Sequence, residues 1–552
     1  MMTFFTGPTR SPFTASALFA IGFFLMPCFA ASPCHAAAYE SPNIVVILVD
    51  DMGYSDIGCF GSEISTPNID QIANQGVRMT HFYNGGMCVT TRASFMTGKW
   101  WPSALRTFNQ TPLLPARLGA AGYRSALIGK WHLAGHPLDH GFDHFFGFLG
   151  GFADHFRGAK DYWLDRDVFT DFGPDYYSTD ALTDRAIEFV HQSSAKNRSK
   201  TGRNGNKRNP YFLFLSYQAP HNPLQAPPAA IKRHRGKYLV GWQAIREARF
   251  ERQKAMGLVP SDAELPPYPQ NLPPWDSLSD EQKDLEDLRM SVYAAMVEQV
   301  DQGVGRLLQT IDEMGQTDDT LILFLSDNGT DSFSIADKPL LAMGLLPGDP
   351  GSNFQPGTGW GYAAVTPWRL YKISQHAGGV TTGAVLRWPG KTGTPGRMTS
   401  RPVHMIDLLP TLLDVAQADS PESRKKFNEI DGESFAPLIR GESWRREKPL
   451  HFQYMDNRAI RTSKWTLVEV DGSGWELFDN QSDPLETNDV SQHKPEVVKE
   501  LSDNWLAWWR EQKQVKNYKP TSTKTGPHYR PQGDRGTGDM YVPSTMPKRL
   551  AK

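Results

Sequence analysis

The segment from Cys88 to Gly98 combines a nucleophile, a cation and several hydroxyl-bearing residues. Gly85 and Gly86 precede it, and a glycine pair that leads into a short helix exposes backbone N–H groups able to bind an anion. Cys88 and Arg92 are four residues apart, so a helix would place both on one face. A nucleophile beside a fixed cation at a helix N-terminus suits attack on a negatively charged tetrahedral group.

Two other interpretations of Cys88 compete with the catalytic one. Most free cysteines are buried structural residues, and on these residues alone that is the simpler interpretation. The chain has four cysteines, of which Cys28 and Cys34 fall in a predicted leader. An exported protein can pair the remaining two, Cys59 and Cys88, in a disulfide. The three interpretations stay open at this point.

Oxygen-bearing side chains follow two predicted strands. The apolar runs 43–49 and 320–325 are typical of strands buried on both faces, and each leads directly into polar residues. Adjacent carboxylates after a buried strand are costly unless they are paired or bind a cation, although solvated acids in a loop are an equal alternative. Hard oxygen donors suit Ca²⁺ or Mg²⁺ and argue against zinc. The candidate metal ligands are Asp50, Asp51, Asp327 and Asn328.

Basic side chains follow two further predicted strands, 123–128 and 211–217, and one lies in the later segment 366–372. Residues two apart in an extended segment point to the same side, as Lys130 and His132 are expected to do. Single lysines and histidines usually belong to the surface or the core, but their repetition at strand ends favours a shared site. Together such donors can neutralise a doubly charged oxyanion. The candidates are Arg92, Lys130, His132, His221 and Lys372.

The order of the predicted elements indicates an α/β fold. Strands alternate with helices without an internal repeat, which predicts a central, mostly parallel mixed sheet covered on both faces. Polar residues at the strand ends then gather at one edge of this sheet. We expect one helix in the proline-rich stretch 225–276 and a long loop over 331–364. Short alternating strands from about residue 449 predict a smaller C-terminal α+β domain with an antiparallel sheet.

Composition excludes several classes of protein. With 552 residues, 39% hydrophobic and 21% charged, the chain is globular and long enough for a large and a small domain. Its net charge of -2 provides no global basic field for nucleic acid or a membrane surface. We expect a catalytic domain over 39–445, a C-terminal subdomain over 446–515 and an extended tail over 516–552.

Residues 1–38 are predicted to form a signal peptide. Arg10 supplies positive charge, residues 15–29 are largely apolar, and three alanines at 36–38 offer a cleavage site. The apolar run is short and contains Pro27, so we expect no stable membrane insertion. The expected location is therefore periplasmic or secreted.

The Cys88 segment resembles the sulfatase signature, Cys/Ser-x-Pro-x-Arg followed by Thr-Gly, in which the cysteine is oxidised to formylglycine. Thr90 stands where the family has proline or sometimes alanine, a position that the modifying enzymes recognise. Ala377 stands where the family usually has glutamate. Further motifs occur in the family's order, and bacterial arylsulfatases are most similar. They are 129–133 (GKWHL), 219–221 (APH), 326–329 (SDNG), 366–372 (TPWRLYK) and 475–479 (WELFD).

The resemblance implies the alkaline-phosphatase-like fold and hydrolysis of an aryl or carbohydrate sulfate by a formylglycine made from Cys88. It implies Ca²⁺, or less favourably Mg²⁺, held by Asp50, Asp51, Asp327 and Asn328 with the modified Cys88. The expected partners are a sulfated small molecule or glycan and a formylglycine-generating maturation enzyme. The other implied roles are alkoxide stabilisation by Arg92, sulfate binding by Lys130 and Lys372, proton donation by His221 and proton acceptance by His132.

Two alternative functions remain open from the sequence. The same metal and oxyanion groups can serve a phosphodiesterase or a phosphonate monoester hydrolase. If Cys88 stays unmodified, the chain is instead expected to bind sulfated glycans without turnover, and Thr90 is the residue that favours this alternative.

Overall fold

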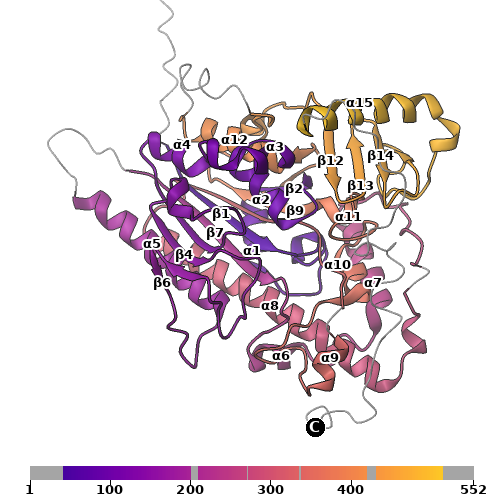
Figure 1. Ribbon diagram of the computed structural model, residues 1–552, viewed down its shortest axis with the longest axis horizontal. Coiled ribbons are helices and arrows are strands. Elements are labelled where there is room, and N and C mark those ends of the chain that lie inside the picture. The colour runs from indigo at the N-terminus through magenta and orange to yellow at the C-terminus, as the bar shows by residue number, and fades with distance from the viewer. Residues whose placement is uncertain (1–40, 200–208, 270–271, 335–336, 419–429, 514–552) are drawn as a thin grey trace, which may run out of the picture. The chain divides into compact units, whose positions relative to one another are not determined.

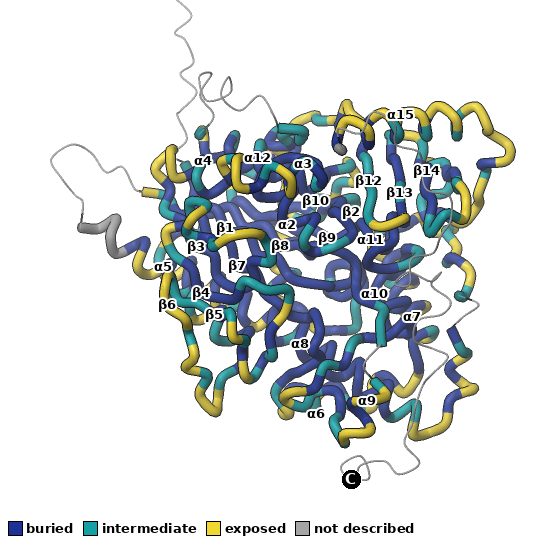
Figure 2. The backbone as a smooth tube through the Cα atoms, viewed as in Figure 1, coloured by how far each residue is buried: buried dark blue, intermediate teal, exposed yellow. Residues whose placement is uncertain are grey.

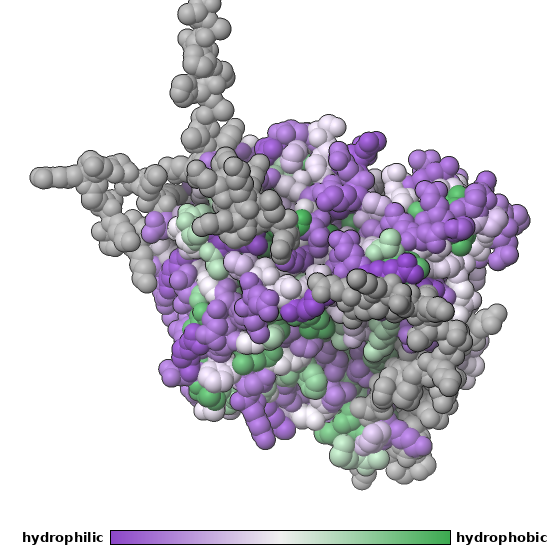
Figure 3. Space-filling view, turned by 45° about the horizontal axis from the view of Figure 1, so that its top comes forward, coloured by the Kyte–Doolittle hydropathy of each residue, from purple (hydrophilic) through white to green (hydrophobic). Residues whose placement is uncertain are grey.

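The computed structural model describes residues 41–199, 209–269, 272–334, 337–418 and 430–513 (Figure 1). The predicted signal peptide 1–38 and tail 516–552 lie outside these ranges. Within them, no helix combines the length and the apolar character that crossing a membrane requires. Hydrophobic residues on the face in Figure 3 form small areas scattered among hydrophilic ones.

An eleven-stranded mixed sheet forms the centre of the protein, in the order β10-β2-β9-β8-β1-β7-β3-β4-β5-β6, with β11 also paired to β2. The four middle pairings, β8 to β1, β1 to β7, β7 to β3 and β3 to β4, are parallel, and so are β10 to β2 and β11 to β2 at one edge. The strands are β1 (Asn43–Asp50), β2 (Val77–Tyr83), β3 (Arg124–Lys130), β4 (His144–Phe148), β5 (Tyr162–Leu164), β6 (Asp167–Val168), β7 (Tyr211–Pro220), β8 (Thr320–Ser326), β9 (Thr381–Arg387), β10 (Arg397–Thr399) and β11 (Val403–His404).

Strand β1 shows why the middle of the sheet is apolar on both faces. Its odd-numbered residues from Val45 to Val49 enter one hydrophobic core, and its even-numbered residues from Ile44 to Leu48 enter another. Each such side chain is fully buried and contributes about 1.5–3 kcal/mol. The continuous apolar run therefore predicted this strand correctly.

Helices cover both faces of the sheet (Figures 1 and 2). α1, α5 and α8 share the core on one face, whereas α2, α4 and α12 share the core on the other. Helix α8 begins with a capping box, in which Ser279 and Gln282 exchange side-chain and backbone hydrogen bonds. The helices of this domain are α1 (Pro67–Gln75), α2 (Cys88–Thr97), α3 (Trp101–Arg106), α4 (Leu114–Ala120), α5 (Ser178–Ser199), α6 (Pro228–His234), α7 (Gly241–Ala255), α8 (Asp280–Glu313), α9 (Asp337–Ala342), α10 (Gly357–Ala364), α11 (Ala377–Val380), α12 (Leu408–Val415) and α14 (Ala436–Ile439).

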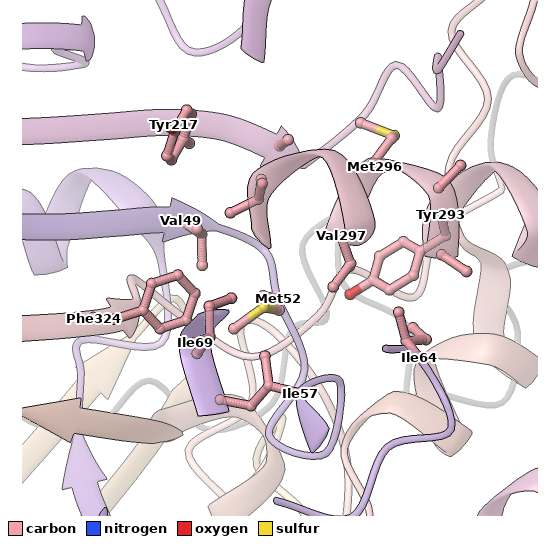
Figure 4. Packing of buried hydrophobic residues seen from close by; sticks show 14 of the residues in the cluster. Val49, Met52, Ile57, Ile64, Ile69, Tyr217, Tyr293, Met296, Val297 and Phe324 are labelled. Carbon is pink, nitrogen blue, oxygen red and sulfur yellow. The ribbon is translucent and has the colours of Figure 1, made fainter. Parts of the chain in front are cut away.

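The loop that follows β1 is packed firmly against its surroundings. Met52 and Ile57 lie among buried residues of α1 and α8, including Ile69 and Val297 (Figure 4). The Tyr293 hydroxyl of α8 also contacts this loop (Asp56 Oδ2, 2.6 Å). This packing fixes the backbone directly after Asp50, where candidate metal ligands occur.

A second sheet lies near the C-terminus and is antiparallel, as predicted. Its strands share a hydrophobic core with α15 (Pro495–Lys513), to which Trp505 and Trp508 contribute. The strands are β12 (Leu450–Tyr454), β13 (Asn457–Arg461), β14 (Trp465–Glu469) and β15 (Glu476–Asp479).

Two expectations about irregular regions were wrong. The stretch 331–364 contains α9 and α10, and the stretch 225–276 contains α6 in addition to the predicted helix α7. The disulfide alternative is also wrong, because Cys59 and Cys88 are both free and buried.

Candidate active site

Four oxygen-bearing side chains meet at the carboxyl ends of β1 and β8. The two strands are parallel neighbours with Val49 opposite Ser326, so the residues that follow them lie at the same edge. Asp50, Asp51, Asp327 and Asn328 are all completely buried. Oδ1 of Asp50 and Oδ1 of Asn328 accept no hydrogen bond from any described residue. Buried oxygens without donors fit a cation, since leaving them unsatisfied is costly.

Basic side chains surround these acids. Lys130 Nζ lies 2.5 Å from Asp50 Oδ2, and Lys372 Nζ lies 2.6 Å from Asp51 Oδ1. Burial alone would raise the pKa of Asp50, but Lys130 and the other nearby cations hold it well below its usual range. Burial and the neighbouring Asp50 raise the pKa of Asp327 to about 7. The site thus concentrates negative charge that a divalent cation would stabilise further.

Cys88 is the first residue of α2 and is buried. Its Sγ lies 3.2 Å from Nδ1 of His132, and it interacts electrostatically with Lys130, Lys372, Asp50 and Asp327. Burial raises the pKa of the thiol, which disfavours the thiolate. An unmodified cysteine is therefore a poor nucleophile at this position.

Arg92 lies one turn after Cys88 and connects three strand ends. Its Nε and Nη2 contact Asp327 Oδ2 at 3.0 and 2.9 Å. Its Nη1 donates to the Lys130 carbonyl at 2.9 Å and to Ser216 Oγ at 2.6 Å. Arg92 consequently fixes the helix that carries Cys88 against β3, β7 and β8.

Thr90 has a clear local role at the position where the signature has proline. Its Oγ1 donates to the Met87 carbonyl at 2.7 Å and to the Gly85 carbonyl at 3.0 Å. The next hydroxyl, Thr91 Oγ1, accepts from Gly85 N–H at 2.8 Å. These hydrogen bonds hold the glycine pair against the first turn of α2.

The two candidate histidines differ in their surroundings, which affect where each ring can hold a proton. Burial and the adjacent Lys130 lower the pKa of His132 to about 3, so its imidazole is neutral and can accept a proton. Nδ1 of His221 lies 2.6 Å from the Asn222 carbonyl, which can only accept, so Nδ1 carries the hydrogen. Nε2 of His221 faces the site, 3.5 Å from Asp51 Oδ2. Asp50, Asp51 and His221 also place possible ligand atoms within 4.8 Å of one another.

Ala377, the second departure from the sulfatase pattern, lies beside a buried carboxylate from a distant part of the chain. Glu486 Oε2 accepts from Ala377 N–H at 3.2 Å and from His376 Nδ1 at 2.7 Å. Arg461 completes this group at 2.7 Å from Glu486. The turn after Lys372 is thereby held to the C-terminal sheet.

Sequence reasoning missed Glu486 and two other residues near the site. Phe152 is 52% exposed, yet its ring stacks on His221 with centroids 6.3 Å apart and an interplanar angle of 21°. Asp331 is buried, which together with its surroundings raises its pKa to about 6, and it interacts electrostatically with Lys372. Phe152 follows two glycines, and Asp331 lies in a predicted loop. Neither position belongs to a sequence pattern that indicates a functional residue.

All ten candidate residues thus lie in contacts that connect the ends of β1, β3, β7 and β8 with the start of α2 and the 366–372 segment. The fold places an oxygen-rich cradle beside a buried cysteine. The sulfatase family model matches residues 42–418, and the chain belongs to this family. It is a sulfuric ester hydrolase. The model for the N-sulphoglucosamine sulphohydrolase C-terminal region matches residues 372–512.

Known proteins agree with this assignment. An arylsulfatase of Klebsiella aerogenes is 31% identical over 72% of this chain and 91% of its own. An uncharacterized sulfatase of Schizosaccharomyces pombe is 29% identical over 86% of this chain and 94% of its own. The solved structure of Ps i-CgsB is 26% identical, with a TM-score of 0.63 over 87% of this chain and 96% of that chain. The same protein has been solved in complex with a neocarrahexaose.

Proposed function

We propose that this chain hydrolyses sulfate esters through a formylglycine derived from Cys88, with Ca²⁺, or less favourably Mg²⁺, as the bound cation. The observation that carries the proposal is the position of Cys88 next to His132 and among the charges of Lys130, Lys372, Asp50 and Asp327. The formylglycine, when hydrated, supplies one hydroxyl that attacks sulfur and a second that drives release of sulfate.

The cation is proposed to bind Asp50, Asp51, Asp327 and Asn328, together with an oxygen at the modified Cys88. Their donors are the hard oxygens that calcium prefers, and two of them have no protein partner. When bound, the cation supplies positive charge that polarises the sulfate oxygens. Lys130 and Lys372 are proposed to bind the remaining sulfate oxygens through charge-assisted hydrogen bonds.

The two histidines are proposed to transfer protons in different steps, one when the alcohol departs and the other when sulfate is released. His221 donates a proton from Nε2 to the departing alcohol oxygen, which requires the doubly protonated ring because Nδ1 keeps its hydrogen on the Asn222 carbonyl. Burial lowers the pKa of His221, so this form is a strong proton donor. His132 is neutral, its Nδ1 is adjacent to position 88, and it accepts the proton of the second hydroxyl. Arg92 keeps α2 in place for both steps. The net reaction converts a sulfate ester and water into an alcohol, sulfate and one proton.

The proposed substrates are carbohydrate or aryl sulfates. The arylsulfatase of Klebsiella aerogenes supports the aryl class, and the neocarrahexaose complex of Ps i-CgsB supports a saccharide. We also propose that the chain is exported to the periplasm or secreted and meets a formylglycine-generating enzyme on the way.

Release of inorganic sulfate from an activated aryl sulfate tests the proposal. The protein is produced with a formylglycine-generating enzyme, and the matching aryl phosphate and phosphonate esters are assayed on the same preparation. We expect kcat/KM to be highest for the sulfate ester. A preference for either phosphorus ester would support the alternative hydrolase function instead.

Removing the cation is expected to abolish turnover and to lower stability. Chelation leaves the buried Asp50, Asp51 and Asp327 with only their lysine and arginine partners, while calcium at about 100 times its dissociation constant adds about 2.7 kcal/mol. We expect EDTA to lower Tm and Ca²⁺ to restore both Tm and activity. An unchanged Tm with unchanged activity would contradict a metal site, and an Asp327→Asn variant should show a smaller response to Ca²⁺.

Phe152→Ala is expected to weaken turnover of substrates with ring-shaped leaving groups. The ring is exposed beside His221, which is the proposed proton donor to that group, so a sugar or aryl ring can stack on it. Loss of such a contact lowers kcat/KM about 5-fold. The matched control is Leu239→Ala, which is 48% exposed and away from the site. An equal loss for a short alkyl sulfate would contradict the stacking role.

A further inference from the structure

A cavity of about 550 Å³ lies between the edge of the main sheet and the C-terminal sheet. We call it the basic pocket. None of its lining residues belongs to the ten candidate site residues. It is formed by 81 and 83 of β2, 368 and 377 of the segment around Lys372, 400–402, 445–450, 461–463, 480 and 484.

Positive charge dominates the lining of the basic pocket. Arg401, Arg445 and Lys448 are exposed, and in the described part of the chain none of them has an ion-pair partner. Arg446 and Arg461 also line the pocket, but they form ion pairs with Asp407 and Glu486, which are not part of the lining. Glu447 is the one acidic residue among the lining side chains. This local excess contrasts with the overall net charge of -2.

Two buried donors of the lining have no acceptor among the described residues. Trp368 is 4% exposed, and its Nε1 donates to none of them. Arg461 is 6% exposed, and its Nε is likewise unpaired although its other nitrogens bind Glu486, Thr466 and the Gln375 carbonyl. A buried donor without an acceptor costs free energy, and both donors belong to residues that line the pocket.

The walls of the pocket also carry flat apolar surfaces. Tyr83, Trp368, Pro402 and Pro449 all line it, and His81 lies edge-on to Trp368 with ring centroids 5.8 Å apart. The volume falls within the roughly 300–1,000 Å³ of small-ligand sites and is far larger than one inorganic oxyanion needs. Flat walls under a basic rim suit a ring that carries acidic groups.

We propose that the basic pocket binds a sulfated sugar unit at a second site, separate from the catalytic one. The choice of sulfate as the acidic group rests on the proposed function. Arg401, Arg445 and Lys448 bind the sulfate groups, with arginine well suited to two oxygens at once. Tyr83 and Trp368, which line the pocket, supply flat surface for the sugar ring. A chain with several sulfates can thus be held here while another unit is hydrolysed.

The test measures binding of a disulfated disaccharide, its unsulfated parent and inorganic sulfate by calorimetry. The full-length protein with Cys88→Ala is used, so that the ligand is not consumed. The pocket variant carries Arg401→Glu and Arg445→Glu. The matched control carries Lys232→Glu and Lys237→Glu, which are exposed and change the net charge equally. Circular dichroism confirms that both variants are folded.

We expect the disulfated disaccharide to bind roughly 10- to 100-fold more weakly to the pocket variant than to the control. The unsulfated disaccharide should bind weakly to both. Equal affinity in the two variants would overturn the proposal, and so would binding of inorganic sulfate as tightly as the disaccharide. Sulfate release by the unsubstituted protein is scored separately, so binding without turnover would count against the proposed function and not against the pocket.

Discussion

Cys88→Ala is expected to lower kcat for an activated aryl sulfate by about 10⁴-fold or more, because it removes the nucleophile on which covalent catalysis depends. The fold should survive, since α2 is also held by Arg92 and by the hydroxyls of Thr90 and Thr91. Steady-state release of inorganic sulfate measures the effect. Retained turnover in the variant would contradict the account.

Cys59→Ala is the matched control for that substitution. Cys59 is also buried and free, but it lies beside Asp70 and away from the candidate site. We expect full turnover in this variant and only a small loss of stability. If both cysteine variants lost activity equally, the loss would reflect folding, and the catalytic role of Cys88 would fail.

Arg249→Ala is expected to cost about 3–5 kcal/mol in the free energy of unfolding, because it leaves the buried Asp56 carboxylate without its counter-ion. Arg249 is completely buried and lies 2.6 Å from Asp56 and 2.7 Å from Glu63. These acids belong to the packed loop after β1. Urea denaturation followed by tryptophan fluorescence measures the change.

Arg252→Ala is the control on the same helix, α7. Its side chain is 37% exposed, and its distance of 3.5 Å from Glu63 is long for an ion pair. We therefore expect a loss of about 1 kcal/mol or less. Losses of equal size in the two variants would contradict the importance of burial. Activity should fall with Arg249→Ala before global unfolding, since the loop adjoins Asp50 and Asp51.

The sheet could be predicted because its middle strands are covered on both faces, which demands continuous apolar runs such as 43–49. The polar residues of the site could be predicted because each directly follows such a run. Parallel pairing then brings them to one edge, as with Asp50 and Asp327. Local sequence was sufficient wherever the position in the fold depended on the end of a strand.

The missed features depend on contacts between distant residues. Glu486 reaches His376 across 110 positions, and Arg249 reaches Asp56 across 193, with no local pattern to indicate either pair. Phe152 is a candidate functional residue only because its ring stacks on His221, which lies at the end of another strand.

Helix α10 was missed because its glycines suggested a loop. A Cβ on Gly359 would lie 2.3 Å from the Trp242 ring, so glycine is required there by packing and not by a turn. Trp360 is buried in the same region, where it contacts Trp242 and donates to the Glu286 carbonyl at 3.0 Å. Tertiary contacts therefore outweigh the poor helix propensity of this segment.

Mass spectrometry of the tryptic peptide 79–92 tests the central claim most directly. The protein is purified from a host with a formylglycine-generating enzyme, and the state of Cys88 is read from the peptide mass before and after reaction with a hydrazide. The account predicts an aldehyde or its hydrate at Cys88, which would also establish that Thr90 permits maturation. An intact thiol in a preparation that releases sulfate at full rate would contradict it.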